Sequence, residues 1–215
     1  MDGFLENVFK KAVNLHNLKN YKDAITLYEK VLKFKPSHKL ALINLANIFD
    51  QFGNLIKTKY YLEKLFFFES YNPEIIFRLG LIYLRLNDEK NAIIYFDKII
   101  DIDPKFKNLR YNLLNIIHSI NILNLKKNHQ KIISKIFLFI LKHNDVDHSF
   151  ISRPLISFLF DKDILINELI KREITNSSFF NNLIDQEIFQ LFLQKTIITD
   201  KQLEQLLTKI RQEFI

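Results

Sequence analysis

The sequence predicts an all-α fold that begins with a repeat of paired helices. The 215 residues contain only three glycines and four prolines, too few for the many tight turns of a sheet protein. In addition, three segments align without gaps at a period of 34 residues: 5–38, 39–72 and 73–106. Apolar residues make up 48% of the chain, so we expect one large or two small domains with a buried core.

Within this period, the residue types in each column match what a pair of packed helices needs. A small residue allows close helix contact in each first helix, at Ala12, Ala46 and Gly80. A large residue fills the space between stacked pairs, at Tyr28, Leu62 and Phe96. Proline follows the second helix in the first and third repeats, at Pro36 and Pro104, where a helix must stop.

These columns resemble the tetratricopeptide repeat. The resemblance implies a right-handed array of about three and a half repeats over residues 1–127, the last being a partial repeat at 107–127. The second repeat departs most, with Thr58 and Ser70 in place of the usual Ala and Pro. The partial repeat ends because Lys126 falls where the pattern expects Ala.

From residue 128 to 215 the period is lost, although helical spacing of apolar residues continues, as in 132–141. Ser152-Arg153-Pro154 has the proline of a first helical turn, and Thr199-Asp200-Lys201-Gln202 has the spacing of a capping box. We therefore expect a helical region that caps or extends the array.

The last residues, 184–215, also resemble the helical connector of bacterial proteins in which a tetratricopeptide array precedes a methyltransferase domain. Asp185-Gln186-Glu187-Ile188-Phe189 and Leu203-Glu204-Gln205-Leu206-Leu207 are among the residues that carry the resemblance. It implies that the chain is the non-catalytic front of a larger enzyme. A gene that continues past Ile215 into a glycine-rich strand–helix pattern would favour this alternative, and a stop codon would favour an adaptor.

The sequence offers no signal for catalysis, a cofactor or a metal. The absence of cysteine excludes thiolate zinc sites and cysteine nucleophiles, and the isolated glycines exclude a phosphate loop. His143-Asn144-Asp145-Val146-Asp147-His148 has enough metal-ligand side chains by number, but this composition is more typical of a turn between helices. We predict no enzyme activity and no metal.

In tetratricopeptide proteins the first helices line a concave face that binds partners, and the resemblance implies the same here. Two adjacent columns would form this face: Phe9, Ile43, Phe77 and Tyr111, and Val13, Asn47, Leu81 and Asn115. Asn44 and Arg78 match a set that grips peptide carboxylates in some members, but the other three positions of that set do not match. The apolar column suggests an amphipathic helix or an apolar segment as ligand, or the chain's own second half.

One basic segment carries the whole positive excess of +7. Residues 104–144 contain no acid and eight basic residues: Lys105, Lys107, Arg110, Lys126, Lys127, Lys131, Lys135 and Lys142. This segment could be a solvated face, a partner for the acidic last third of the chain, or a binding site for an acidic partner. Nucleic acid is not favoured as that partner, because arginines are few and no nucleic-acid-binding motif is present.

The function predicted from the sequence is that of a protein-interaction scaffold or adaptor. Acids at the amino end argue against a signal peptide, and the longest apolar run is too short to span a bilayer. We therefore expect a cytoplasmic location.

Overall fold

A computed structural model describes residues 2–120, 127–143, 148–159 and 187–195, together with residues 204 and 208. The chain forms two compact units, Met1–Phe106 and Lys107–Ile215. Every regular element in the described residues is a helix, and none of these residues lies in a strand. The predicted all-α fold is therefore confirmed.

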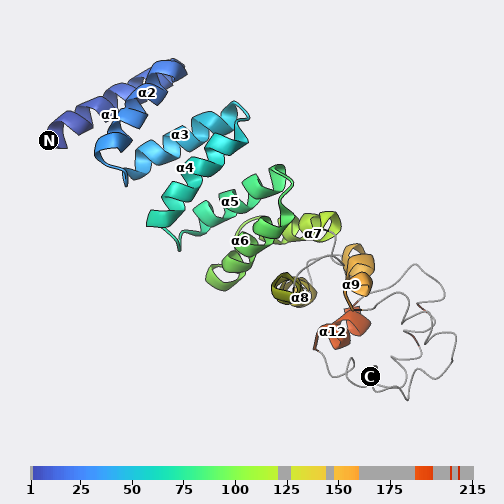
Figure 1. Ribbon diagram of the computed structural model, residues 1–215. Helices are drawn as coiled ribbons and strands as arrows, with labels where there is room; N and C mark the ends of the chain where they lie inside the picture. Colours follow the sequence, from blue (N-terminus) through green and yellow to red (C-terminus); the bar gives the residue numbers. More distant parts are fainter. Residues whose placement is uncertain are drawn as a thin grey trace. The chain divides into compact units, whose positions relative to one another are not determined.

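The amino-terminal unit consists of three successive helix pairs (Figure 1). The helices are α1 (Asp2–Asn17), α2 (Tyr21–Phe34), α3 (Lys39–Gln51), α4 (Leu55–Phe68), α5 (Pro73–Arg85) and α6 (Glu89–Ile102). First helices end at positions 17, 51 and 85, and second helices end at 34, 68 and 102. The 34-residue period of the sequence is thus the period of the structure.

The turns repeat with the same period as the helices. The residue before each second-helix cap has a left-handed backbone, with φ of 61° at Lys19, 68° at Gly53 and 56° at Asn87. The next residue then caps the second helix with its side chain, at Asn20, Asn54 and Asp88. Asn and Asp supply the oxygen that an unpaired backbone N–H of the first turn needs, which explains where these helices begin.

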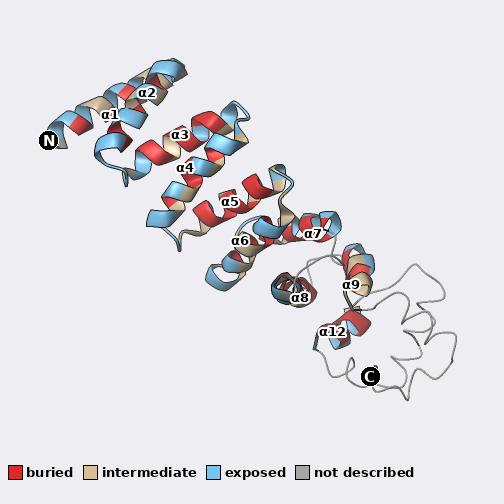
Figure 2. Ribbon diagram, viewed as in Figure 1, coloured by how far each residue is buried: buried red, intermediate tan, exposed pale blue. Residues whose placement is uncertain are grey.

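The core of this unit is built from the columns that the sequence predicts (Figure 2). Ala12 and Ala46 are fully buried, and so are Tyr28, Leu62 and Phe96. Gly80 is buried as well, which confirms the third small position. The small residues therefore lie at close helix contacts, where a larger side chain would force the helices apart.

The carboxy-terminal unit is described in four pieces. Its elements are α7 (Leu109–Ser119), α8 (Lys127–Leu141), the 3-10 helix η2 (His148–Ile151), α9 (Ser152–Leu159) and α12 (Glu187–Lys195). The α12 helix packs on α8, where Lys195 Nζ donates to the Leu141 carbonyl at 2.7 Å. The α9 helix begins at Ser152 with proline in its first turn, as the sequence predicts.

Two sequence expectations concern parts of this unit that the structure describes only in part. The partial repeat 107–127 contains α7 and falls in the carboxy-terminal unit, whereas the sequence placed the boundary after residue 127. The capping-box segment Thr199-Asp200-Lys201-Gln202 lies outside the described residues, as does most of 184–215. Among the described residues, no helix is long and apolar enough to cross a bilayer.

Candidate protein-binding face

The candidate site is the layer formed by the first helices of the amino-terminal unit, α1, α3 and α5. Of the predicted site residues, Phe9 and Phe77 are buried, Ile43, Val13 and Leu81 are half-buried, and Asn47 is exposed. The remaining two, Tyr111 and Asn115, are exposed on α7 in the other unit. The two columns thus differ in how much surface they offer to a ligand.

The expected exposed apolar stripe is not present at its two phenylalanines, and this corrects the sequence interpretation. Both Phe9 and Phe77 are only 9% exposed. The Phe9 ring packs 4.7 Å from the ring of His38. The Phe77 ring packs 4.8 Å from that of Phe106. In the first and third repeats an aromatic ring after the second helix covers this position, so these two phenylalanines contribute mainly to the core.

Polar side chains join α3 to α5 on this layer. The Nη2 group of Arg78 donates to Oδ1 of Asn47 at 2.8 Å. Further along the same two helices, about one turn beyond Asn47 and two turns beyond Arg78, Arg85 forms an ion pair with Asp50. These side chains are exposed or half-buried, and the two contacts hold the guanidinium groups of two residues that lie about two turns apart on α5.

The junction of the first two repeats has a second polar cluster on the same layer. The buried hydroxyl of Tyr28 accepts a hydrogen bond from Nδ2 of Asn44 at 3.0 Å. Nδ1 of His16 lies 3.3 Å from the same hydroxyl. Burial raises the pKa of the Tyr28 phenol above its usual value, and the Asn44 hydrogen bond opposes part of this effect. The phenol therefore stays neutral and positions His16 and Asn44.

This arrangement can bind a polar chain. A guanidinium has five N–H donors in a fixed plane, and Asn47 uses one donor of Arg78. The other donors suit carboxylates and the carbonyl groups of a peptide. Val13, Ile43 and Leu81 add half-buried apolar surface beside these donors. The layer therefore combines apolar contacts with directed hydrogen-bond donors, as peptide-binding faces do.

The contribution of Arg85 was not predicted from the sequence, although a signal was present. Its partner Asp50 precedes it by 35 residues, one repeat and one position. Asn47 precedes Arg78 by 31 residues, one repeat less three positions. Such offsets place side chains opposite each other on adjacent first helices, so a search for complementary pairs at these spacings would have found both contacts.

The basic segment is divided between the two units, with Lys105 in the first and the other described members in the second. Lys105 is exposed in the amino-terminal unit, and Lys107 and Lys131 are exposed in the other unit. Lys142 pairs with Glu187 of α12 at 2.7 Å, which is a contact between the basic segment and the acidic last third. Arg110 and Lys135 are half-buried, while Lys126 lies outside the described residues, as does the side chain of Lys127.

The His143–His148 stretch does not form a metal site in its described residues. His143 Nδ1 lies 2.7 Å from the Phe139 carbonyl, and His148 Nε2 lies 3.3 Å from the Ile140 carbonyl. Both rings therefore contact the end of α8. Residues 144–147 lie outside the described residues. In the part of the chain that the structure describes, no group of three or more His, Asp or Glu residues could hold a metal ion.

Comparison with known families agrees with this geometry. Residues 5–38 and 73–106 match the family model described as tetratricopeptide repeat. These segments are the first and third helix pairs, with the boundaries that the period predicts. The amino-terminal unit has the fold of a tetratricopeptide repeat array. This fold generally serves as a non-catalytic scaffold for protein interactions.

Two solved structures resemble the chain at low sequence identity. A tetratricopeptide repeat protein from Parabacteroides merdae ATCC 43184 is 14% identical, with a TM-score of 0.50, over 97% of this chain and 84% of that chain. PilW, described as a widely conserved type IV pilus biogenesis factor, is 16% identical, with a TM-score of 0.42, over 88% of this chain and 98% of that chain. At this identity the first likeness shows the fold alone. No curated protein matches the sequence.

Proposed function

We propose that this chain is a protein-interaction scaffold or adaptor that binds a peptide or helix of a partner on the face of α1, α3 and α5, the expected concave face. The observation that carries the proposal is the pair of contacts Asn47–Arg78 and Asp50–Arg85. Each holds a guanidinium on an accessible surface with donors left for a ligand. We further propose that the chain is not itself an enzyme and that it acts in the cytoplasm.

The ligand that fits this face has both apolar and anionic groups. Val13, Ile43 and Leu81 offer apolar contact at the same level of the first helices as the arginines. A peptide that presents a carboxylate to Arg78 would form a charge-assisted hydrogen bond, which is typically stronger than a neutral one. Because Phe9 and Phe77 are covered, these partly exposed residues replace them as the proposed apolar contacts.

The proposal is tested by capture of partners from an extract of the source cells. The wild-type chain is compared with Arg78→Glu, which reverses the charge at the proposed contact. The matched control is Lys30→Glu, which makes the same reversal of charge at an exposed position of α2. A partner captured by the wild type and the control but lost with Arg78→Glu supports the proposal.

Equal capture by all three proteins would place partner binding elsewhere. A partner's affinity is then measured by calorimetry, to exclude effects of abundance in the extract. We expect Arg78→Glu to weaken binding at least tenfold, which corresponds to about 1.4 kcal/mol. Circular dichroism of each variant excludes unfolding as the cause.

The alternative function, the non-catalytic front of a methyltransferase-type enzyme, rests on the resemblance of residues 184–215 to a helical connector. Nothing in the described residues resembles a methyl-donor site, since Gly3, Gly53 and Gly80 are separate from one another. Sequencing of the gene beyond the codon for Ile215 tests this alternative. In either case we expect the isolated chain to show no binding of S-adenosylmethionine by calorimetry.

A further inference from the structure

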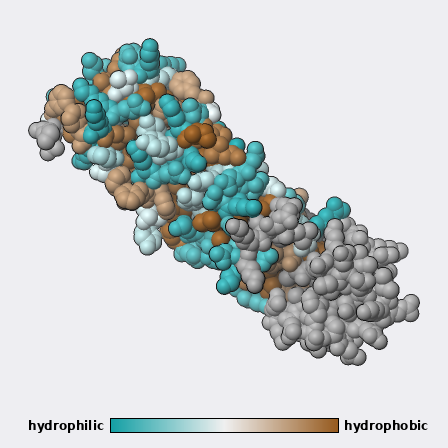
Figure 3. All heavy atoms as spheres, in the orientation of Figure 1, coloured by the Kyte–Doolittle hydropathy of each residue, from teal (hydrophilic) through white to brown (hydrophobic). Residues whose placement is uncertain are grey.

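The outer face of α4 exposes a row of large apolar side chains. Ile56, Tyr60 and Phe67 are 63%, 49% and 80% exposed, and Tyr71, just after the helix, is 81% exposed. The three helical residues are spaced by four and seven positions, so they lie on one side of the helix. We name these four residues the outer stripe. Apolar side chains gather at either end of α4 in Figure 3.

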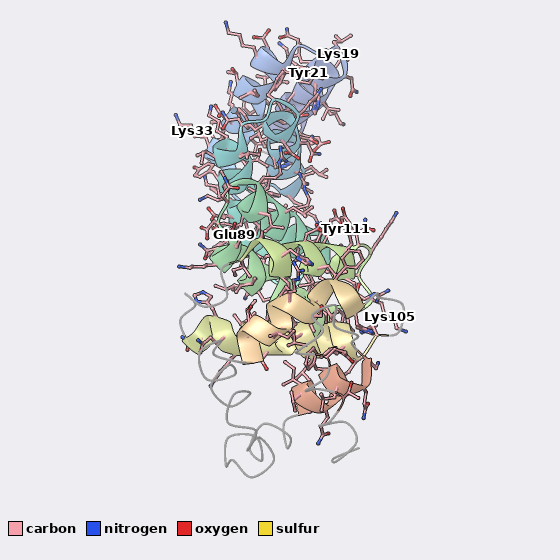
Figure 4. The ribbon with its side chains drawn as sticks, turned by 90° about the vertical axis from the view of Figure 1, so that its right-hand side faces the viewer. Lys19, Tyr21, Lys33, Glu89, Lys105 and Tyr111 are labelled. Carbon is pink, nitrogen blue, oxygen red and sulfur yellow. The ribbon has the colours of Figure 1, made fainter. Side chains whose placement is uncertain are left out.

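The outer stripe is specific to the middle repeat. The corresponding residues of the first repeat are Lys22, Thr26, Lys33 and Ser37. Those of the third repeat are Lys90, Ile94, Asp101 and Lys105. In Figure 4, Lys33, the counterpart of Phe67, points away from the helices. The repeat thus folds with polar residues at most of these positions, and stability of the array does not require the outer stripe.

A neighbouring position shows what the array itself requires. Phe34, Phe68 and Ile102 end the three second helices, and all three are partly exposed. Because this position is apolar in every repeat, it belongs to the repeat architecture. In contrast, the outer stripe is present in only one of the three repeats, so it is not part of the repeat architecture.

The stripe is large enough to be an interaction surface. If a whole aromatic side chain has about 200 Å² of surface, the four residues expose roughly 500 Å². Monomeric proteins rarely expose larger contiguous apolar patches, and patches of this size often mark binding sites.

Lysines border the outer stripe on both sides. Lys57 and Lys64 lie seven residues apart along one border, and Lys59 lies on the other. The Lys64 ammonium lies 4.5 Å from the centre of the Tyr60 ring. Within the described residues, none of these three ammonium groups forms an ion pair with a carboxylate.

The acidic residues of this helix pair are already engaged. Glu63 accepts a hydrogen bond from the Tyr83 hydroxyl at 2.6 Å, and Glu69 pairs with Lys39 at 2.7 Å. Glu63 lies on the same side of the helix, but it is half-buried and its carboxylate is bonded to Tyr83, so the exposed large side chains form an apolar strip with cationic borders. Its electrostatic complement is an apolar strip with anionic borders.

We propose that the outer stripe binds an amphipathic helix of a partner protein whose apolar face is bordered by Asp or Glu. The backbone groups of α4 are bonded within the helix, so they cannot pair with an extended peptide. An occupant that satisfies its own backbone is another helix. The helical part of the stripe, from Ile56 to Phe67, is about 16 Å long at 1.5 Å per residue, which requires at least roughly three turns of the partner.

The same observations disfavour two other occupants. A second copy packed antiparallel about a two-fold axis would bring the same border of both helices together, which places Lys57 and Lys64 near their own counterparts. A bilayer would also contact the outer faces of the neighbouring second helices, where Glu29 and Asp101 are exposed. A strip one helix wide suits a helix better than a flat anionic surface.

This surface is separate from the face of α1, α3 and α5, and the inference does not depend on the proposed function. The test uses the double variant Tyr60→Thr, Phe67→Lys, which installs the residues of the first repeat. Leu18→Lys, at an apolar residue that is 69% exposed elsewhere, is the control. Thermal melts should show all three proteins equally folded, because the first repeat tolerates the installed residues.

The probe is a synthetic 18-residue amphipathic helix with Leu and Ile on one face and Glu at both borders. A second peptide carries Lys at the border positions. Fluorescence anisotropy should show that the Glu peptide binds the wild type and Leu18→Lys. It should bind the double variant at least tenfold more weakly. The Lys peptide should bind the wild type at least tenfold more weakly than the Glu peptide does. Binding should weaken as salt rises.

Several outcomes would overturn the inference. These include no binding of the Glu peptide, equal binding of both peptides, or equal affinity of the double variant. Sedimentation that shows a wild-type dimer, lost in the double variant, would assign the stripe to a second copy. Co-sedimentation with vesicles containing phosphatidylglycerol, lost in the same variant, would assign it to a membrane.

Discussion

The ring of Phe96 occupies the space next to Gly80 that any other residue's Cβ would need. A Cβ at position 80 would lie 2.8 Å from Cζ of Phe96 and 2.9 Å from Cε1, closer than van der Waals contact permits. This contact joins α5 to α6 within the third repeat. With the Phe96 ring in this position, residue 80 has space only for glycine, whereas the other repeats have alanine in this column.

Gly80→Ala should therefore destabilise the array. Alanine favours a helix over glycine by about 1 kcal/mol, but overpacking against a buried ring typically costs about 1–3 kcal/mol. We expect a net loss of about 1 kcal/mol, measured by urea denaturation. Gly80→Ala combined with Phe96→Leu, the residue of the second repeat, should recover most of the loss. A more stable Gly80→Ala protein would contradict the close contact.

Lys19 should tolerate glycine better than its present side chain. Its φ of 61° is left-handed, and the same position of the second repeat is Gly53 at 68°. A non-glycine residue in this conformation costs about 1 kcal/mol. Lys19→Gly should raise the free energy of unfolding by roughly 0.5–1 kcal/mol, whereas Lys22→Gly inside α2 should lower it. A loss of stability in Lys19→Gly would show that the turn is not left-handed.

The Lys39–Glu69 ion pair should make stability depend on pH in the acid range. The hydrogen bond from Lys39 lowers the pKa of the Glu69 carboxyl in the folded state, and Asn72 adds to the effect. A lowered folded pKa stabilises the protein above the unfolded pKa of about 4.3, and this contribution is lost as pH falls through the folded value. Glu69→Gln should therefore cost about 0.2–1 kcal/mol at pH 7 and much less near pH 3.

Chemical denaturation of both proteins at the two pH values checks this prediction. The difference between wild type and Glu69→Gln should also shrink in high salt, because the pair is partly exposed. An equal difference at pH 7 and pH 3 would mean that the carboxylate charge does not contribute.

The fold could be predicted from the sequence because its information is local and repeated. Columns that align without gaps, such as Ala12, Ala46 and Gly80, establish the 34-residue period. The helix ends of the structure, from residue 17 to residue 102, follow the same period. Beyond residue 127 no column repeats. There, helical spacing predicted α8 and the start of α9, but it contained no information about which helices pack together.

The candidate site was less predictable because burial depends on what covers a residue. Phe77 occupies a first-helix column that could face a ligand, yet Phe106, beyond the end of the repeat's second helix, covers it. Conversely, Arg85 has an ordinary surface residue type, and only its contact with Asp50 on the adjacent helix makes it part of the site. The outer stripe is visible in the sequence, but only when the same positions of the three repeats are compared.

The central claim, that partners bind on the layer of first helices, is tested most directly by site-specific cross-linking. The chain has no cysteine, so one introduced cysteine can carry a benzophenone photo-cross-linker at a chosen position. Leu81→Cys places it on the proposed face, and Lys90→Cys places it on the outer side of α6. Irradiation with a partner whose capture is lost with Arg78→Glu should give a covalent adduct from position 81 and none from position 90; an adduct of that partner from position 90 alone would contradict the claim.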